Sequence, residues 1–411
     1  MPANRDSWVF VLTLTSAAAV LVSIAAAETL LAIACLAWIA LRPKPVVWPS
    51  YFVPLCAFML TTVLALLMSP QPSAGMAAVR KFVLFSMGFL AANLVTTPGR
   101  ARIAHGTLIA VATAASLLAL GQFVVTYIHF LSTHDLAYDP TVLGRIKGFM
   151  GHWMTFSGEQ VLIWCAAVPA LIALGRRWTI PVTAIGATLI LSFTRSAWLG
   201  AIAGVAAVAL FLPRRVLIPV LFPLVIVTAA ASGLIYHRVT QSFETTSANP
   251  NSGAGEGVSS RLKLWKTGVR MIHEHPLAGV GPERIHAEFP RYYQGSDLAV
   301  AVPYYGHMEN NIMQLAAERG LLCLAAFLWF IFELYASLIG MLKSAAEDRR
   351  WAILSALAAL TGFIVSGFFE YNFGDSEVFL LFLFIVSIPY GITAAIPVED
   401  PCPTNLIPTT S

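Results

Sequence analysis

Charged side chains are scarce in this 411-residue chain. Asp, Glu, Lys and Arg together make up 11% of the residues and hydrophobic residues 58%, whereas soluble domains contain about 25% charged residues. This composition excludes a soluble domain and predicts an integral membrane protein. The apolar runs are too long for the strands of a membrane barrel, which alternate over about ten residues. We therefore expect an all-α, polytopic membrane protein.

Several motifs are also missing. None of the five cysteines lies between residues 237 and 308, and no CxxC or Cys/His spacing occurs, so neither a disulfide framework nor a zinc site is indicated. The chain has no GxxxxGK[ST] and no GxSxG sequence, which argues against an ATP-driven pump and an α/β-hydrolase. No Asp-x-Asp pair lies near the polar region. We therefore expect neither a metal nor a cofactor.

What the chain does have is a series of apolar runs. At roughly 20 residues per membrane span, we predict about twelve transmembrane helices. The runs are 8–24, 27–42, 51–69, 76–96, 101–130, 154–174, 178–194, 195–212, 215–236, 311–342, 351–370 and 376–396. Two of the divisions split longer apolar runs, at Glu28 and at Thr194-Arg195. We expect the first run to stay uncleaved, because it continues directly into the second.

The short loops fix an orientation, because Lys and Arg collect on the cytoplasmic side. With the N-terminus inside, every short inner loop carries at least two cations: Arg42 and Lys44, Arg100 and Arg102, Arg176 and Arg177, Arg214 and Arg215, and Lys343, Arg349 and Arg350. The outer turns near residues 26 and 373 carry none. This alternation predicts cytoplasmic N- and C-termini, with a cytoplasmic tail at 398–411.

One long polar segment, residues 237–308, interrupts the apolar sequence between helices 1–9 (residues 1–236) and helices 10–12 (residues 309–397). The topology places it on the outer side of the membrane. It contains seven Lys and Arg residues and ends near His307. We expect a mobile run at 245–255 and an amphipathic helix from Ser259, with Leu262, Trp265, Val269 and Ile272 on its apolar face. A second short helix is predicted at 285–293.

Cations on the outer side are candidates for function, since topology does not require them there. Arg80, Lys81 and Arg195 lie in or beside apolar runs, where a cation at mid-helix costs about 2.5–3.5 kcal/mol. Each therefore needs an anionic partner or a water-filled cavity. Arg145 and Lys147 are further outer cations.

At these residues the chain resembles the O-antigen ligase and polymerase superfamily of bacterial membrane glycosyltransferases. The resemblance covers about residues 190–325 and rests on four pieces in order: Thr194-Arg195-Ser196, Ser260-Arg261 with Trp265, His275 to Gly281, and His307 with Asn310, Gln314, Glu318 and Gly320. Glu309 stands where many relatives have a second His, so no role of that His is carried over.

The resemblance implies a fold similar to GT-C-type glycosyltransferases and a glycan donor linked to undecaprenyl diphosphate. The acceptor would be lipid A-core, reached at the periplasmic face of the inner membrane. The short tail after the last span resembles the ligase branch.

The chemistry of such a donor assigns roles to named residues. Arg195 and Arg261 would hold the diphosphate, because a guanidinium fork binds phosphate oxygens in pairs. Arg80, Lys81, Arg145 and Lys147 are further candidates for binding the diphosphate or its lipid. His307 would take the proton from the acceptor hydroxyl. A single displacement would invert the anomeric centre without a metal. Glu309, Asn310 and Trp265 would support the site.

Each assignment has a structural alternative. Arg195 could mark a helix end, Arg261 could be a solvated face residue, and His307 could be a helix cap. Arg80 and Lys81 could reach outer headgroups, while Arg145 and Lys147 could be plain loop charges. Glu370, Asn372 and Asp375, in the last outer turn, could face the cavity, but we interpret them as structural.

Other functions also remain open. An O-antigen polymerase would use the same donor, a secondary transporter could use the outer cations as an anion vestibule, and a scaffold would leave these cations without a role. A transporter would typically show inverted repeats and broken helices at mid-membrane, and we see neither in the sequence.

Overall fold

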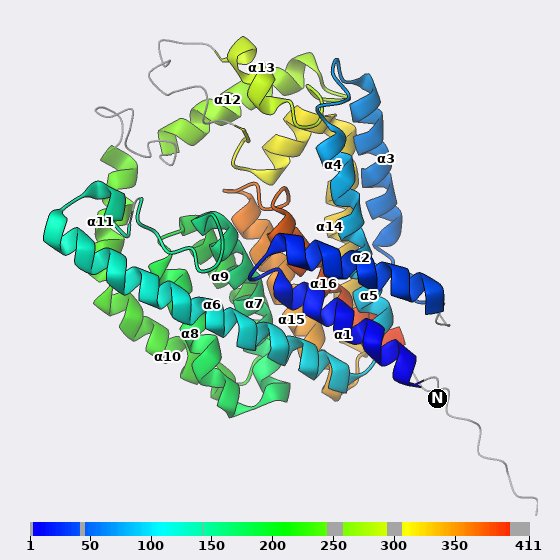
Figure 1. Cartoon of the computed structure of the whole chain (residues 1–411), viewed down its shortest axis with the longest axis vertical. Coiled ribbons are helices and arrows are strands. Elements are labelled where there is room, and N and C mark those ends of the chain that lie inside the picture. Colours follow the sequence, from blue (N-terminus) through cyan, green and yellow to red (C-terminus); the bar gives the residue numbers. More distant parts are fainter. Residues whose placement is uncertain (1–2, 42–45, 142, 245–257, 294–305, 395–411) are drawn as a thin grey trace, which may run out of the picture.

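The computed structural model describes residues 3–41, 46–141, 143–244, 258–293 and 306–394, and this described part is helical with loops and turns (Figure 1). The predicted mobile run at 245–255, the cytoplasmic tail at 398–411, and the inner-loop cations Arg42 and Lys44 lie outside the described residues.

The helices follow one another along the chain with short connections. They are α1 (Ala3–Ala19), α2 (Ile24–Leu41), α3 (Phe52–Met68), α4 (Met76–Arg80), η1 (Lys81–Phe85), α5 (Ser86–Leu94), α6 (Pro98–Thr133), η2 (Leu136–Tyr138), α7 (Trp153–Leu174), η3 (Arg176–Trp178), α8 (Thr179–Leu191), α9 (Arg195–Val208), η4 (Ala209–Phe211), α10 (Arg214–Ala230), α11 (Ser232–Glu244), α12 (Val258–Glu274), α13 (Ile285–Tyr292), α14 (Asn311–Ser344), α15 (Glu347–Gly367) and α16 (Ser376–Ala394).

The chain is a polytopic helical membrane protein. Among the described residues, seven helices are long and apolar enough to cross a membrane, and α10 with α11 forms a pair bent by 67° that would make an eighth. Three shorter apolar helices, at Asp6–Ala19, Phe52–Met68 and Arg195–Phe211, fall below that length. All twelve predicted runs are largely helical, but twelve spans remain a prediction.

One predicted boundary is displaced. Glu28 lies inside α2, and the chain instead turns between α1 and α2, at residues 20–23. Glu28 is exposed on the surface of α2, so its charge does not need a turn. Across the turn, the Ser16 hydroxyl donates to the carbonyl oxygen of Ala27 at 2.7 Å and joins the two helices. The division at Thr194-Arg195 is present, since α8 ends and α9 begins there.

Helices α7, α15 and α16 form the centre of the bundle and are buried along most of their length. Helix α9 lies against α15 through glycines. A Cβ atom on Gly200 would lie 2.7 Å from the carbonyl oxygen of Gly362, and one on Gly204 would lie 2.5 Å from that of Ala358. Small residues of this kind let helix backbones approach closely in membranes.

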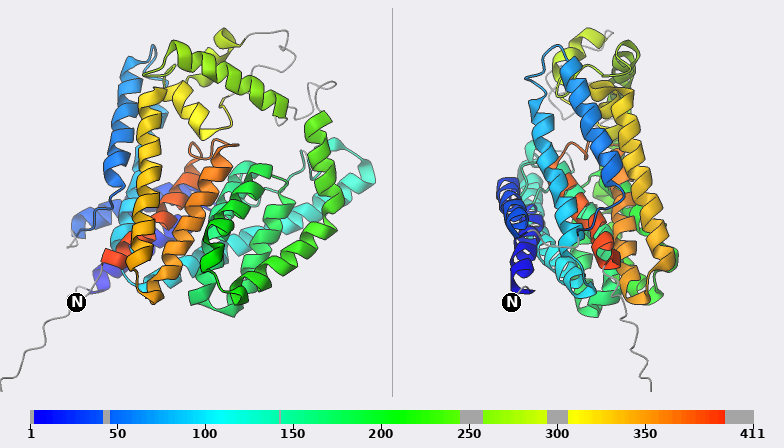
Figure 2. Two further views of the ribbon diagram at one scale, coloured as in Figure 1. Left: turned by 180° about the vertical axis from the view of Figure 1, so that it is seen from behind. Right: turned by 90° about the vertical axis from the view of Figure 1, so that its right-hand side faces the viewer.

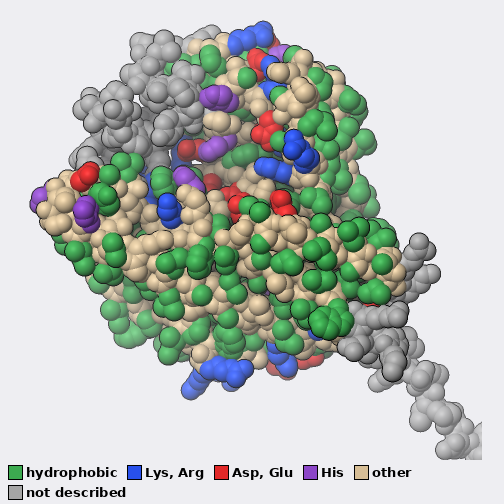
Figure 3. Space-filling view, viewed as in Figure 1, with side chains coloured by type: hydrophobic (Ala, Val, Ile, Leu, Met, Phe, Trp, Pro, Cys, Tyr) green, Lys and Arg blue, Asp and Glu red, His purple; other side chains and the backbone are tan. Residues whose placement is uncertain are grey.

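The two ends of the bundle differ. Helices α12 and α13 lie across one end, while the connections between α7 and α8 and between α9 and α10 lie at the other (Figures 1 and 2). Lys and Arg side chains gather along that second end, below a belt of hydrophobic side chains (Figure 3). The polar segment and the short basic loops are therefore on opposite ends, as the predicted topology requires.

Helices occur at both places predicted in the polar segment, as α12 and α13. On the predicted apolar face of α12, Leu262 and Val269 are exposed, so this face does not pack against the bundle. The buried face instead carries Leu264 and Met271. These residues pack into one cluster with residues of α13 and with Met308, so contact with the rest of the chain decides which face is covered.

Candidate active site

The segment that leads into α14, residues 306–310, is bound to α12 through side chains. Arg261 Nε donates to Glu309 Oε2 at 2.8 Å, and the two side chains are only 15% and 13% exposed. One helical turn further along α12, Trp265 Nε1 donates to the carbonyl oxygen of Met308 at 3.1 Å. The two contacts place His307 beside this helix, although 48 residues separate Arg261 from Glu309.

Polar side chains at the start of α14 hold the same segment. Asn310 caps the helix, because its Oδ1 accepts from the amide of Met313 at 3.0 Å, and its Nδ2 donates to the carbonyl oxygen of Phe368 at 2.8 Å. Gln314 Oε1 accepts from the amide of Met308 at 2.7 Å. These are the residue types favoured at and just after a helix N-terminus. The segment before α14 is thus fixed at several points.

A buried ion pair extends this support into α14. Glu318 accepts from the side-chain amide of Gln314 and, through Oε1, from Arg319 Nε at 3.1 Å. The same oxygen accepts from the amide of Glu283 at 3.1 Å. Glu318 and Arg319 are 2% and 5% exposed. Burying one charge of such a pair alone would be costly. Because Glu318 bonds both Gln314 and the amide of Glu283, it connects the start of α14 to the segment around Glu283.

Helix α14 is broken where the run 276–281 crosses it. Gly320 has φ 82° and ψ 172° within the helix, a conformation that is essentially restricted to glycine. A Cβ atom there would lie 2.1 Å from a carbonyl oxygen of the run. The amide of Val280 donates to the carbonyl oxygen of Ala317 at 2.9 Å. The break therefore exposes carbonyls of α14 that the crossing run satisfies.

The loop between α15 and α16 lies below the His307 segment and contains a buried carboxyl group. Glu370 is 6% exposed and accepts from Ser196 Oγ at 3.3 Å. Burial, followed by the nearby charge of Asp375, raises the pKa of Glu370 to about 8, while the Ser196 bond and the charge of Arg261 oppose the rise. Because Ser196 follows Arg195, the start of α9 lies at this loop.

Further side chains tie this loop to α14, α7 and η1. These contacts are Asn311 to Asn372 at 2.7 Å, Thr155 to Asp375 at 2.6 Å, and Lys81 Nζ to the carbonyl oxygen of Gly374 at 2.7 Å. With the Ser196 bond, the loop is the place where the ends of α7, α9, α14 and η1 meet.

His307 faces this loop. Its ring centroid lies 6.4 Å from that of Tyr371, and its Nδ1 is buried without a hydrogen-bond partner among the described residues. Burial lowers the pKa of the His307 imidazole, the charge of Glu309 opposes this, and the charge of Arg261 adds to it. A lowered pKa keeps the ring neutral at neutral pH, which is the form that accepts a proton.

Comparison with known protein families finds one similarity in this region. Residues 180–328 match the sequence model of a family described as O-antigen ligase. This part of the chain is therefore similar to the O-antigen ligase family. The match runs from α8 into α14 and includes Arg195, Arg261, His307 and Gly320. No curated protein matches the chain.

This match to the O-antigen ligase family model confirms the predicted resemblance. The structure brings together five of the predicted site residues, His307, Arg261, Glu309, Asn310 and Trp265, on α12 and the start of α14. Arg195 is connected to the site through its neighbour Ser196, which donates a hydrogen bond to Glu370. The catalytic roles of these residues stay predictions.

The other predicted cations are placed differently. Lys81 is half-buried at the loop between α15 and α16. Arg145 is 6% exposed, with its guanidinium 4.1 Å from the ring centroid of Trp153, at the start of α7. Arg80 and Lys147 are exposed. Lys81 therefore connects η1 to the loop that carries Glu370.

Sequence reasoning named Glu370, which lies outside residues 180–328, but interpreted it as structural rather than as part of the site. The available signal was an acidic outer turn, Glu370 to Asp375, between two apolar runs with no cation in it. A carboxyl group there must either reach solvent or find partners in the bundle. The structure shows the second outcome.

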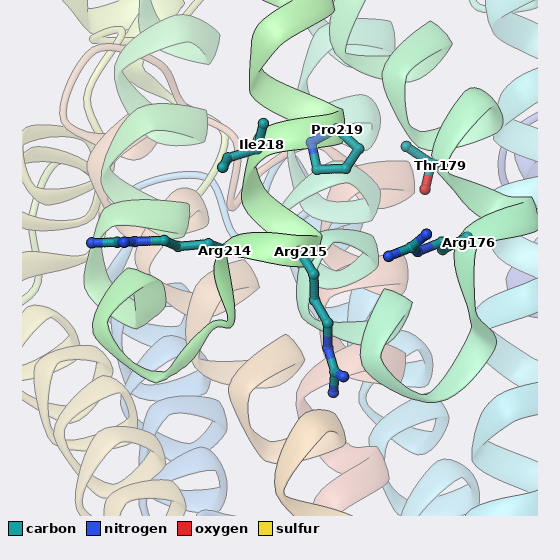
Figure 4. A pocket seen from close by; sticks show the side chains of 6 residues that line it. All are labelled: Arg176, Thr179, Arg214, Arg215, Ile218 and Pro219. Atoms are coloured by element: carbon teal, nitrogen blue, oxygen red, sulfur yellow. The ribbon is translucent and has the colours of Figure 1, made fainter.

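The surface around these residues is hollowed. Figure 3 shows a depression below the α12–α13 layer, lined by acidic, basic and His side chains. A separate hollow of about 410 Å³ lies at the opposite end and is lined by Arg176, Arg214, Arg215 and neighbours (Figure 4). That hollow is remote from His307. Among the described residues, no group of three or more His, Cys, Asp or Glu is arranged to hold a metal ion.

Proposed function

We propose that this protein is an O-antigen ligase. It transfers O-antigen polysaccharide from undecaprenyl diphosphate to a sugar hydroxyl of lipid A-core, at the periplasmic face of the bacterial inner membrane. The family match supports a membrane glycosyltransferase of the ligase or polymerase type. The proposal includes twelve spans in a GT-C-type arrangement, with both termini in the cytoplasm and α12 and α13 in the periplasm.

The observation that carries the proposal is the buried contact between Arg261 and the segment of His307. A guanidinium with little exposure lies beside a neutral imidazole. A guanidinium can bind an anionic leaving group, and a neutral imidazole can accept a proton. Their closeness suits a reaction that needs both functions at one place. Glu370, with its pKa raised to about 8, is largely uncharged at neutral pH and would not neutralise the guanidinium.

Arg195 and Arg261 hold the donor diphosphate in this proposal. As the bond between the anomeric carbon and the diphosphate oxygen breaks, its electron pair stays on that oxygen. Fixed guanidinium groups in a site with little water stabilise this charge as it forms. Lys81 and Arg145 provide positive charge at the edges, and Arg80 and Lys147 lie on the surface where lipid phosphates would approach.

His307 activates the acceptor. The acceptor oxygen forms the new bond to the anomeric carbon from the face opposite the leaving group, and its proton passes to His307. One displacement of this kind inverts the configuration of the anomeric carbon. An unactivated sugar hydroxyl is a poor nucleophile at neutral pH, so loss of the base should slow transfer by about 10²–10⁴-fold.

An O-antigen polymerase is the alternative within the same family. It would use the same donor but pass the glycan to another lipid-linked glycan. Deleting the gene separates the two. Full-length polymer that accumulates on the lipid carrier, with none on lipid A-core, indicates a ligase; a loss of chain length indicates a polymerase. A transporter would instead leave the purified protein unable to transfer glycan between supplied donor and acceptor.

A further inference from the structure

The Arg261–Glu309 contact places a carboxylate on the guanidinium assigned to the donor. Carboxylates and phosphates bind the same guanidinium edge, and Glu309 Oε2 lies 2.8 Å from Arg261 Nε. Glu309 therefore occupies part of the site where the diphosphate would bind. Both side chains are shielded from solvent, so the guanidinium retains an anion even without substrate.

The backbone at Glu309 shows that this contact is imposed by its surroundings. Glu309 has φ 48°, in the left-handed region, which non-glycine residues other than Asn and Asp seldom adopt. The residue is held between the Trp265 bond to Met308 and the Asn310 cap. Strained positions of this kind persist only where neighbouring contacts hold them, and they gather at functional sites.

A buried group without a hydrogen-bond partner lies two residues away. His307 Nδ1 is buried and has no hydrogen-bond partner among the described residues. A buried nitrogen that lacks a partner costs free energy in that state. A state in which the nitrogen gains a partner is therefore favoured. The Glu309 carboxylate is close enough to act electrostatically on the imidazole, but its recorded bond goes to Arg261.

We propose that Glu309 is a positioning residue that exchanges partners when the donor binds. The diphosphate takes Arg261 from Glu309, and the released carboxylate accepts a hydrogen bond from Nδ1–H of His307. This hydrogen bond fixes the tautomer in which Nε2 carries the lone pair, so the acceptor proton passes to Nε2. The inference rests on the proposed function and adds an order to it: the donor binds first and completes the base.

The charges around His307 give this exchange a pH signature. The groups that face the ring are Glu309 on its own segment, Arg261 on α12 and Tyr371 on the loop between α15 and α16; Glu370 acts on Arg261 and Glu309 from the same loop. Burial raises the pKa of Tyr371, so it stays uncharged. Neutralising Arg261 and freeing Glu309 both raise the pKa of His307.

The direction of the pH shift follows from the role of His307 as a base. A base is active when deprotonated, so activity rises with pH through its pKa. The rising limb of the pH profile of kcat/KM reports the pKa of the base in the free enzyme. The rising limb of the kcat profile reports its pKa in the donor complex. The kcat limb is therefore expected at higher pH than the kcat/KM limb, and Glu309→Gln should bring the two limbs together and lower kcat.

Donor binding gives an independent readout. With undecaprenyl diphosphate alone as the probe, Glu309→Gln should bind about tenfold more tightly, because a charge-assisted hydrogen bond no longer competes for Arg261. Glu309→Asp keeps the charge but shortens the side chain and should lie between the two. Glu274→Gln is the matched control, because it removes a Glu–Arg pair of the same layer, with Arg291 at 2.8 Å, away from His307.

The outcomes separate this inference from the function on which it rests. If Arg261→Ala and His307→Ala lose transfer but Glu309→Gln and Glu309→Asp keep the parent's probe affinity and pH limbs, the exchange is wrong and the ligase remains. If Arg261→Ala transfers normally, the function itself is wrong. Should Glu309→Gln fail to fold in detergent, Glu309→Asp decides, and parental values for it overturn the exchange.

Discussion

Arginines at the two ends of the bundle have different surroundings. At one end, Arg176, Arg214 and Arg215 are exposed (Figure 4) and have no ion pair among the described residues. At the other end, Arg261 is mostly buried and bonded to Glu309, and Arg319 is buried against Glu318. Exposed cations in short loops are explained by topology alone. Buried ones require a charged partner, which Glu309 and Glu318 provide in this structure.

Replacing arginines at the two ends by alanine should have opposite outcomes. Arg261→Ala and Arg195→Ala are each expected to abolish detectable glycan attachment to lipid A-core, since removing one stabilising donor typically costs about 10²–10³-fold in rate. Arg214→Ala should leave attachment intact. Lipopolysaccharide gels of cells expressing each variant measure this, with membrane levels checked by immunoblot. Normal capped lipopolysaccharide in both outer variants would remove the diphosphate assignment.

His307→Ala should separate binding from chemistry. Transfer is expected to fall by about 10²–10⁴-fold, while the affinity for undecaprenyl diphosphate stays within a few fold of the parent, because the proposed clamp remains. Purified protein with donor and acceptor measures transfer, and the lipid alone measures binding. A variant that still transfers at the parental rate would show that the base is another group.

Replacing the glycine at the break in α14 should lower the stability of the folded protein. Gly320→Ala places a Cβ atom against the crossing run and forces alanine into a glycine conformation, at a cost of at least about 1–3 kcal/mol. We expect a lower unfolding temperature and weaker transfer. Gly340→Ala in the same helix is the control, because nothing lies within 4 Å of its added Cβ. Equal unfolding temperatures for the two variants would contradict the account of the break.

Glu370 should make stability depend on pH. Its pKa is raised to about 8 in the folded protein from about 4.3 for an unperturbed Glu, so its favourable contribution is present below the unfolded pKa and is lost as pH rises through the folded one. Glu370→Gln should therefore gain unfolding temperature relative to the parent between pH 5 and pH 9. Thermal unfolding in detergent at both pH values tests this, and a constant difference would be inconsistent with a buried, protonated Glu370.

The smallest expected effect is that of a chelator. If guanidinium groups stabilise the leaving diphosphate, transfer by purified protein should be unchanged within a factor of two by an excess of chelating agent. Loss of activity that added Mg²⁺ restores would show that a divalent cation shares this role with Arg195 and Arg261.

Much of the fold could be predicted because membrane helices are defined by local apolarity. The twelve runs, the amphipathic stretch at α12 and the break at Thr194-Arg195 all follow from neighbouring residues. The buried face of α12 could not be predicted in this way. Leu262 and Leu264 are equally apolar, and contact with Met308, more than 40 residues away, determines which of them is buried.

The site was predictable where residue types are unusual for their place, and not elsewhere. Arg195 and His307 stood out as polar groups at the edges of apolar runs. Glu370 did not, because an acidic residue in an outer turn is ordinary by itself. Its burial depends on Gly200 and Gly204, which bring α9 close to α15 and so place Ser196 beside the turn.

The crossing at Gly320 also limits where a bound glycan can leave the site. Backbone bonds on both sides of the break, Gly281 to Glu318 at 2.9 Å and Leu321 to Pro276 at 2.7 Å, fasten the α12–α13 layer to α14 like a seam. A sugar polymer of many units cannot be enclosed and has to extend out of the protein. We expect it to leave on the side away from these bonds, so that the transferred glycan never has to separate the α12–α13 layer from α14.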